Sequence, residues 1–152
     1  MNVEDKLQAS SFDLERFVKA QNSVFDDVLE ELRDGYKRTH WMWYIFPQLV
    51  NFCRTPISHY YGISGIEEAR AYLEHQVLGP RLIEVSQVIL DLDIDNPAMI
   101  FGTVDANKLC SCMTLFHLAA PDEEIFSQVI DKFYAGLWDN KTIEIVEAAP
   151  SL

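Results

Sequence analysis

The sequence contains none of the short motifs that mark common catalytic or cofactor sites. It has no GxSxG nucleophile turn, HExxH zinc motif, Walker A loop, GxGxxG dinucleotide loop or EF-hand spacing. Asp91, Asp93 and Asp95 alternate in "DLDID", but the glycine and the final glutamate of a calcium loop are missing. The sequence therefore names no reaction, and we expect neither a cofactor nor a bound metal.

Positive charge is scarce, because 12 Lys and Arg residues stand against 24 Asp and Glu residues, for a formal net charge of −12. Nucleic acid is therefore not an expected partner, and an anionic membrane surface is disfavoured for the same reason. No apolar run approaches the roughly 20 residues that span a bilayer. Residues 1–12 lack the basic start and apolar core of a signal peptide, so we expect a cytoplasmic protein.

Cysteine occurs only at Cys53, Cys110 and Cys112. An odd number without an export signal favours reduced thiols over a disulfide framework. The spacing of Cys110 and Cys112 fits neither a redox CxxC pair nor a zinc knuckle. The cysteines therefore predict no site.

Stretches with the alternating pattern of strands are nearly absent, whereas most segments from Phe12 onward repeat with helical period. A chain of 152 residues with 49% hydrophobic side chains can bury a core as about one domain. We predict an all-α fold, a compact single-domain bundle of about six to eight helices over residues 12–147. Residues 1–11 and 148–152 are expected to form flexible tails.

Helix start signals divide this domain into segments. They are Asp13, Ser23, Ser64 with Glu67, Gly79-Pro80, Asn96-Pro97 and Thr103. The last strong helix is expected within residues 122–136. Residues 141–148 are compatible with a short helix or an extended tail.

The segment "KRTHWMWYIFPQL", residues 37–49, places two basic residues and a histidine before six large apolar side chains. Its uniform apolar character hides any period, so a buried strand and a buried helix would look alike. Thr39 is an acceptable helix cap and Pro47 a natural stop. Since no neighbouring strand is available for pairing, we favour a helix.

Acidic residues are missing from residues 35–66, although several bases and eight aromatic residues fall there. A core segment would exclude bases as well as acids, because an unpaired buried cation is costly. The pattern favours an aromatic-lined patch that accepts an anion. Its donors would be Lys37, Arg38 and His40, with Trp41 or Trp43 as the stacking ring. In the alternative, structural interpretation, the bases pair with acids from other helices and the indoles fill the core.

Lys108 and Ser111 lie three residues apart on the helix expected after Thr103. This hydroxyl-rich side would suit a ligand. It would equally let two helices approach closely through small residues.

The phrase "HWMWYIFPQL", followed in order by "EARAYLEHQVLGPRL" and "NKLCSCMTLF", resembles an uncharacterised family catalogued as domain of unknown function 1810. Its members sometimes carry the label calpastatin-like. The resemblance covers about residues 12–146 and implies a compact all-α bundle but no reaction. The family pattern includes Lys37, His40, Trp41, Trp43, Gln48, Arg81, Asp105, Lys108 and Ser111.

Two classes of function stay open. In the first, the protein binds, and in its most concrete version hydrolyses, a small anionic or nucleotide-like metabolite. The candidate catalytic residues are His40 and Asp105, and the candidate ligand-binding residues are Lys37, Arg38, Trp41, Trp43, Gln48, Arg81, Lys108 and Ser111. In the second, the aromatic patch binds another protein or a second copy of this chain, so both a monomer and a homodimer are compatible with the sequence.

Overall fold

The computed structural model describes residues 12–148, and in that range it contains nine α-helices and no strand. The elements are α2 (Glu15–Asn22), α3 (Phe25–Arg33), α4 (Met42–Ile45), the 3-10 turn η1 (Val50–Phe52), α5 (Pro56–Tyr60), α6 (Ile66–Glu74), α7 (Leu78–Leu90), α8 (Pro97–Ala119), α9 (Ile125–Tyr134) and α10 (Asn140–Ala148). The all-α prediction is confirmed, and the helix number exceeds the expected one because α4 and α5 are each about one turn long. The predicted tails at residues 1–11 and 149–152 lie outside the described residues, while Ala148 ends α10.

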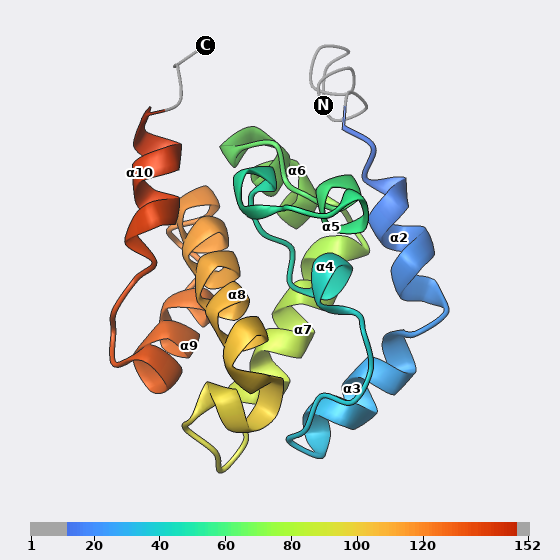
Figure 1. Ribbon diagram of the computed structural model, residues 1–152, viewed down its shortest axis with the longest axis vertical. Coiled ribbons are helices and arrows are strands. Elements are labelled where there is room, and N and C mark those ends of the chain that lie inside the picture. The colour runs from blue at the N-terminus through green and yellow to red at the C-terminus, as the bar shows by residue number, and fades with distance from the viewer. Residues whose placement is uncertain (1–11, 149–152) are drawn as a thin grey trace.

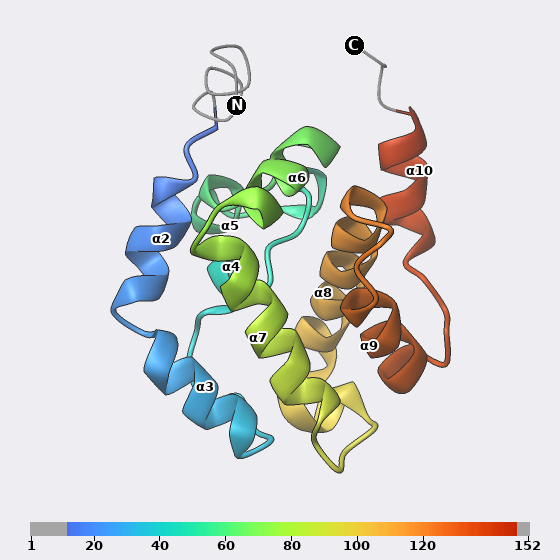
Figure 2. The same ribbon diagram turned by 180° about the vertical axis from the view of Figure 1, so that it is seen from behind.

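Helices α7 and α8 run through the middle of the molecule, with α2 and α3 along one side and α9 and α10 along the other (Figure 1). Seen from behind, α7 crosses the face opposite to α4 (Figure 2). Helix α8 packs against α6, α9 and α10, and α7 packs against α3, α6 and α9. The two middle helices therefore connect the helices on the two sides of the bundle.

A chain of aromatic rings crosses this core. The ring of Phe17 on α2 lies 5.1 Å from that of Tyr72 on α6, which lies 5.3 Å from Phe116 on α8, which in turn lies 6.0 Å from Phe126 on α9. All four side chains are fully buried. Contacts of this kind add to the area that the rings bury, so they tie four helices together.

The start signals gave mixed results. Asn96 caps α8, since its side chain accepts from the backbone N–H of Ala98, and Pro97 occupies the first turn as predicted. The caps predicted at Asp13 and Ser23 are wrong, because Leu14 and Val24 precede those helices without a side-chain cap. Local cap preferences are weak, and tertiary contacts override them.

The capping box predicted at Ser64 and Glu67 is also wrong. Gly65 precedes α6, and the backbone N–H of Ser64 donates to a carboxylate oxygen of Glu68 at 2.8 Å. The start predicted at Gly79-Pro80 is two residues late, since α7 begins at Leu78. The start predicted at Thr103 coincides with a break inside α8, because Gly102 has a non-helical backbone and the helix resumes after it. Residues 97–101 form a helical stretch before that break.

Gly102 breaks the regular geometry of α8, with φ of 78° and ψ of 165°. This backbone conformation is essentially restricted to glycine.

We expect Gly102→Ala to lower the free energy of unfolding by about 1–2 kcal/mol through backbone strain alone, because an added Cβ would meet nothing within 4 Å. Urea unfolding would measure the change. Gly65→Ala is the matched control, since Gly65 has extended φ and an added Cβ would meet no atom closer than 3.8 Å. An equal cost at both glycines would contradict the explanation by strain.

Lys132 on α9 closes the end of α7. Its ammonium group donates to the carbonyls of Leu90, at 2.8 Å, and Leu92, with a longer contact to that of Ile89 at 3.5 Å. The last carbonyls of a helix have no partner within the helix and favour a cation. A side chain from another helix therefore caps the C-terminus of α7.

Candidate functional site

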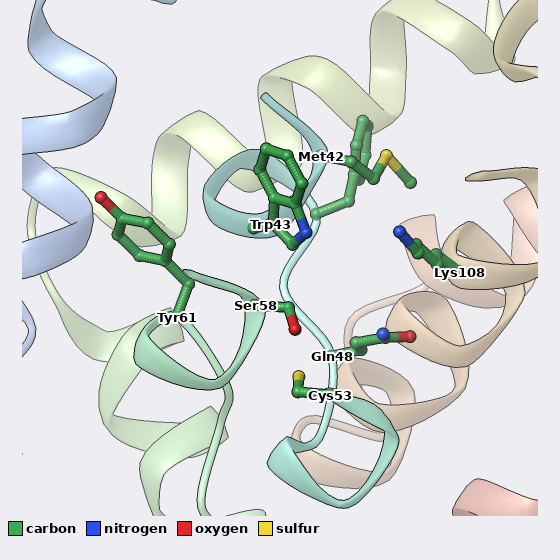
Figure 3. Close-up of a pocket in the computed structure, with 8 residues that line it drawn as sticks. Met42, Trp43, Gln48, Cys53, Ser58, Tyr61 and Lys108 are labelled. Atoms are coloured by element: carbon green, nitrogen blue, oxygen red, sulfur yellow. The ribbon is translucent and has the colours of Figure 1, made fainter. Parts of the chain in front are cut away.

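A small hollow lies among α4, α5 and α8 and the segments that follow α4 and α5 (Figure 3). It is lined by Met42, Trp43, Phe46, Gln48, Cys53, Ser58, Tyr61 and Lys108. The space in it that a water-sized group can occupy is about 10 Å³, which is room for about one such group. Any larger molecule would insert one end and lie over the rim with the remainder.

Trp43 and Lys108 face each other across this hollow (Figure 3). The ammonium nitrogen of Lys108 lies 5.9 Å from the centre of the Trp43 ring. Trp43 and Gln48 are half-buried, so parts of both side chains are open to solvent. The hollow thus combines one cation, one indole and one amide.

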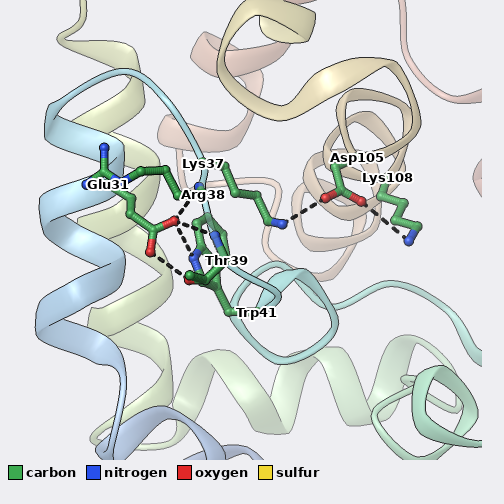
Figure 4. Close-up of polar contacts among 7 residues, drawn as sticks. All are labelled: Glu31, Lys37, Arg38, Thr39, Trp41, Asp105 and Lys108. Carbon is green, nitrogen blue, oxygen red and sulfur yellow. Dashed lines mark hydrogen bonds and ion pairs between the residues drawn. The ribbon is translucent and has the colours of Figure 1, made fainter.

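Lys108, Asp105 and Lys37 form a row of three charged side chains (Figure 4). One carboxylate oxygen of Asp105 pairs with Lys37 at 3.0 Å, and the other pairs with Lys108 at 3.4 Å. The Lys37 side chain is only 9% exposed and its ammonium lies 5.0 Å from the centre of the Trp41 ring, whereas Lys108 is 29% exposed. Lys37 is therefore fixed in the fold, and Lys108 is the cation that a ligand can reach.

Glu31, which no pattern in the sequence singled out as a site residue, binds residues 38–41 (Figure 4). One oxygen of its buried carboxylate accepts from the backbone N–H groups of Arg38, at 2.5 Å, and Thr39, at 2.9 Å, and from Nε1 of Trp41 at 3.2 Å. The other oxygen accepts from the Thr39 hydroxyl at 2.7 Å. Burial alone would raise the pKa of Glu31, but these donors outweigh it and hold the pKa below its usual value. The one available signal was an acidic residue within the apolar face of α3.

These contacts correct the helix predicted for residues 37–49. The helix covers only Met42–Ile45, and Thr39 does not cap it, because both its N–H and its hydroxyl bind Glu31. Trp41, the residue before the helix, has a non-helical φ of −136°. The Glu31 carboxylate thus keeps residues 38–41 out of the helix. It thereby fixes where α4, which carries Trp43, begins.

The structure brings together only part of the predicted site. Trp43, Gln48 and Lys108 line the hollow, and Lys37 and Asp105 lie behind it. The remaining candidates from the same segment lie elsewhere: Arg38 is exposed and pairs with Asp34, His40 is exposed, and Trp41 is buried with its N–H on Glu31. Of the two indoles, only Trp43 is open to a ligand.

Arg81 belongs to a different part of the molecule. Its guanidinium group donates to the side-chain oxygens of Gln21, at 3.3 Å, and Asn22, at 3.0 Å, and lies 4.9 Å from the centre of the Phe25 ring. Gln21 and Asn22 belong to α2, and Phe25 begins α3. Arg81 therefore joins α7 to α2 and α3 and does not reach the hollow.

Ser111 faces α10. Its hydroxyl donates to the carboxylate of Asp139 at 3.1 Å, and that carboxylate also accepts from the N–H of Thr142 at 3.2 Å, where it caps α10. On the same side, the hydroxyl of Thr114 accepts from the N–H of Asp139 at 3.0 Å. The hydroxyl-rich side of α8 thus holds the start of another helix.

Burial disfavours the thiolate form of Cys53, which lines the hollow, and of Cys110, which lies elsewhere on α8. Burial raises the pKa of Cys53, although Ser58 and Lys108 oppose the change. Burial, with a further contribution from Asp139, raises the pKa of Cys110 to about 11. Because the thiolate is the reactive form, neither cysteine is prepared to act as a nucleophile.

Within residues 12–148, no helix is both long and apolar enough to cross a bilayer. In the same range, no three His, Cys, Asp or Glu side chains gather in a way that could hold a metal ion.

Comparison with known proteins gives a family and a fold. The family model described as "Protein of unknown function (DUF1810)" matches residues 11–146. The crystal structure of the conserved hypothetical protein Rv1873 from Mycobacterium tuberculosis is similar, with 45% sequence identity and a TM-score of 0.89 over 91% of this chain and 99% of that chain. No curated protein matches this chain. The predicted family resemblance is confirmed.

Proposed function

The chain belongs to the DUF1810 family of proteins of unknown function, and from its hollow we propose that it binds a small anionic molecule with a planar apolar part. The observation that carries this proposal is the partly exposed ammonium group of Lys108, which lies opposite the indole of Trp43. The anionic end would enter beside Lys108, and the planar part would lie against the Trp43 ring.

The contacts of Lys108 support a ligand-binding role. Its pairing with Asp105, at 3.4 Å, is longer than that of Lys37, at 3.0 Å, and its side chain is more exposed. An incoming anion can thus contact Lys108 without breaking the more buried pair. The amide of Gln48 provides a further donor at the rim.

We propose binding without bond cleavage. Both carboxylate oxygens of Asp105 face ammonium groups, so this residue is poorly placed to act as a base. His40 is absent from the lining of the hollow, and the thiol of Cys53, which is present, is protonated. The free thiols fit a reducing compartment, so the proposal places the binding in the cytoplasm.

The rim of the hollow supports a second candidate function. On α5, Ile57 is 50% exposed and Tyr60 is 55% exposed, beside the lining residues Ser58 and Tyr61. Exposed apolar side chains that gather on one helix favour contact with another protein, including a second copy of this chain. Under this interpretation the apparent mass depends on concentration, and small anions have no effect.

Titration with benzoate and phenyl phosphate, followed by tryptophan fluorescence and thermal unfolding, tests the binding proposal. We expect a change in fluorescence and a rise in melting temperature for the wild-type protein. Trp43→Phe should abolish the fluorescence change, whereas Trp138→Phe, next to α10, should keep it. Lys108→Met should weaken binding at least about tenfold, because it removes the reachable cation.

The matched charge control is Lys141→Met, since Lys141 is exposed on α10. It should bind like the wild-type protein. Equal losses in Lys108→Met and Lys141→Met would indicate a general charge effect and contradict the site. Absence of any response to either anion would contradict the proposed function.

A further inference from the structure

We propose that the site selects ligands with a single negative charge, aromatic carboxylates rather than dianionic phosphate esters, and that Asp105 sets this preference. The inference rests on the proposed function and names its ligand class. It makes Asp105 a specificity-determining residue, in place of the proton-transfer role predicted from the sequence.

The charge at the site supports a monoanion. Lys108 is the one charged side chain among the eight lining residues. Behind it lie one carboxylate, Asp105, and one further ammonium, Lys37. Two cations and one anion leave a single positive charge, which one carboxylate neutralises. A dianion would bring a second negative charge close to Asp105 without a cation to match it.

Asp105 cannot easily move away from such a ligand. Its partner Lys37 is 9% exposed, lies against the Trp41 ring, and donates its backbone N–H to the carbonyl of Ile100 at 2.8 Å. Swinging the carboxylate out would leave the ammonium of Lys37 buried without a partner, which is costly. The negative charge of Asp105 is therefore a fixed part of the site.

The size of the hollow points the same way. A space of about 10 Å³ accepts about one oxygen atom of a ligand. A planar carboxylate can insert one oxygen and continue along the Trp43 ring. A tetrahedral phosphate group would leave its other charged oxygens outside the hollow, where no second lining cation is present to pair with them.

The test compares two ligands of similar size on one protein at pH 8, where benzoate carries one negative charge and phenyl phosphate carries two. We expect wild-type protein to bind benzoate at least about tenfold more tightly than phenyl phosphate. Asp105→Asn raises the local charge by one, so its preference should shift toward phenyl phosphate by about tenfold or more. Isothermal titration calorimetry would give both dissociation constants.

A double variant separates local charge from damage to the fold. Lys37→Met with Asp105→Asn removes both members of the buried pair and returns the local charge to one, so the preference for benzoate should come back. Asp93→Asn, an exposed site in the segment after α7, is the matched control and should keep the wild-type ratio. Because each result is a ratio on one protein, a partly unfolded fraction cancels.

The outcomes distinguish the two proposals. If the wild-type protein binds both anions equally, or if Asp105→Asn leaves the ratio unchanged, the specificity inference is overturned while the proposed function stands. If the double variant keeps the ratio of Asp105→Asn, local charge is not the cause and the inference is again overturned. If no variant binds either anion, both proposals are wrong.

Discussion

Glu31→Ala is expected to lower the free energy of unfolding by about 3 kcal/mol. The buried carboxylate accepts two backbone N–H groups, a hydroxyl and the indole N–H of Trp41. Hydrogen bonds to a charged group contribute more than neutral ones, and the buried Trp41 N–H would lose its partner. Because Glu31 also fixes residues 38–41, the substitution should loosen Lys37 and α4 together. Urea unfolding followed by tryptophan fluorescence would measure the loss.

Glu30→Ala is the matched control, because Glu30 is the preceding residue of the same helix and is exposed. It should change stability by less than about 0.5 kcal/mol. If the two alanine variants unfold at the same urea concentration, Glu31 does not hold the segment before α4.

The same carboxylate should make stability sensitive to acid. The pKa of Glu31 is lowered on folding, so its stabilising contribution is complete above the usual value of 4.5 and is lost as pH falls through the lower folded value. The difference in unfolding free energy between wild-type protein and Glu31→Gln should therefore be largest near neutral pH and shrink in acid. A difference that grew on acidification would have the wrong sign.

Arg16→Met is expected to lower the free energy of unfolding by about 3–5 kcal/mol, which is a larger loss than that expected for Glu31→Ala. The guanidinium group of Arg16 pairs with Glu68 at 3.0 Å and donates to the carbonyls of Tyr60, at 2.7 Å, and Gly62, at 3.0 Å. The two side chains of the pair are only 9% and 4% exposed. Removing the cation would leave a buried negative charge and release the segment after α5, which carries the lining residue Tyr61. Thermal and urea unfolding would show the loss.

Two further variants make the cause specific. Arg54→Met removes an arginine from an exposed position and should be nearly neutral. Adding Glu68→Gln to Arg16→Met should restore part of the stability, because it removes the charge that was left unpaired. Simple additivity of the two single substitutions would show that the pair is not coupled.

The parts of the fold that the sequence predicted are those that local chemistry decides. Asn96 and Pro97 start a helix because the Asn side chain accepts from the N–H of Ala98 and the ring of Pro97 suits the first turn. The start at Ser64 failed because Glu68, four residues later, took its N–H. That contact depends on Arg16 of another helix, which holds Glu68 in place. No local pattern contains such information.

The candidate site shows the same division. The gap in acidic residues from 35 to 66 led to the prediction of Lys37 and Trp43 as site residues, but the counter-charges come from outside that gap. Asp105 on α8 pairs with Lys37, and Asp34 at the end of α3 pairs with Arg38. Whether a base is paired or open depends on which helix lies beside it, and a single sequence does not give that neighbour. Arg81 and Ser111 do not line the hollow, and their side chains bind partners on α2 and before α10.

The ammonium group of Lys132 gives α7 a counter-ion that is covalently part of the chain. In a protein with twice as many acidic as basic side chains, a dissolved cation would be the obvious group to collect beside "DLDID". Here the carbonyls of Leu90 and Leu92 already hold a positive charge that cannot diffuse away. The packing of α9 on α7 therefore needs no exchangeable ion beside those carbonyls.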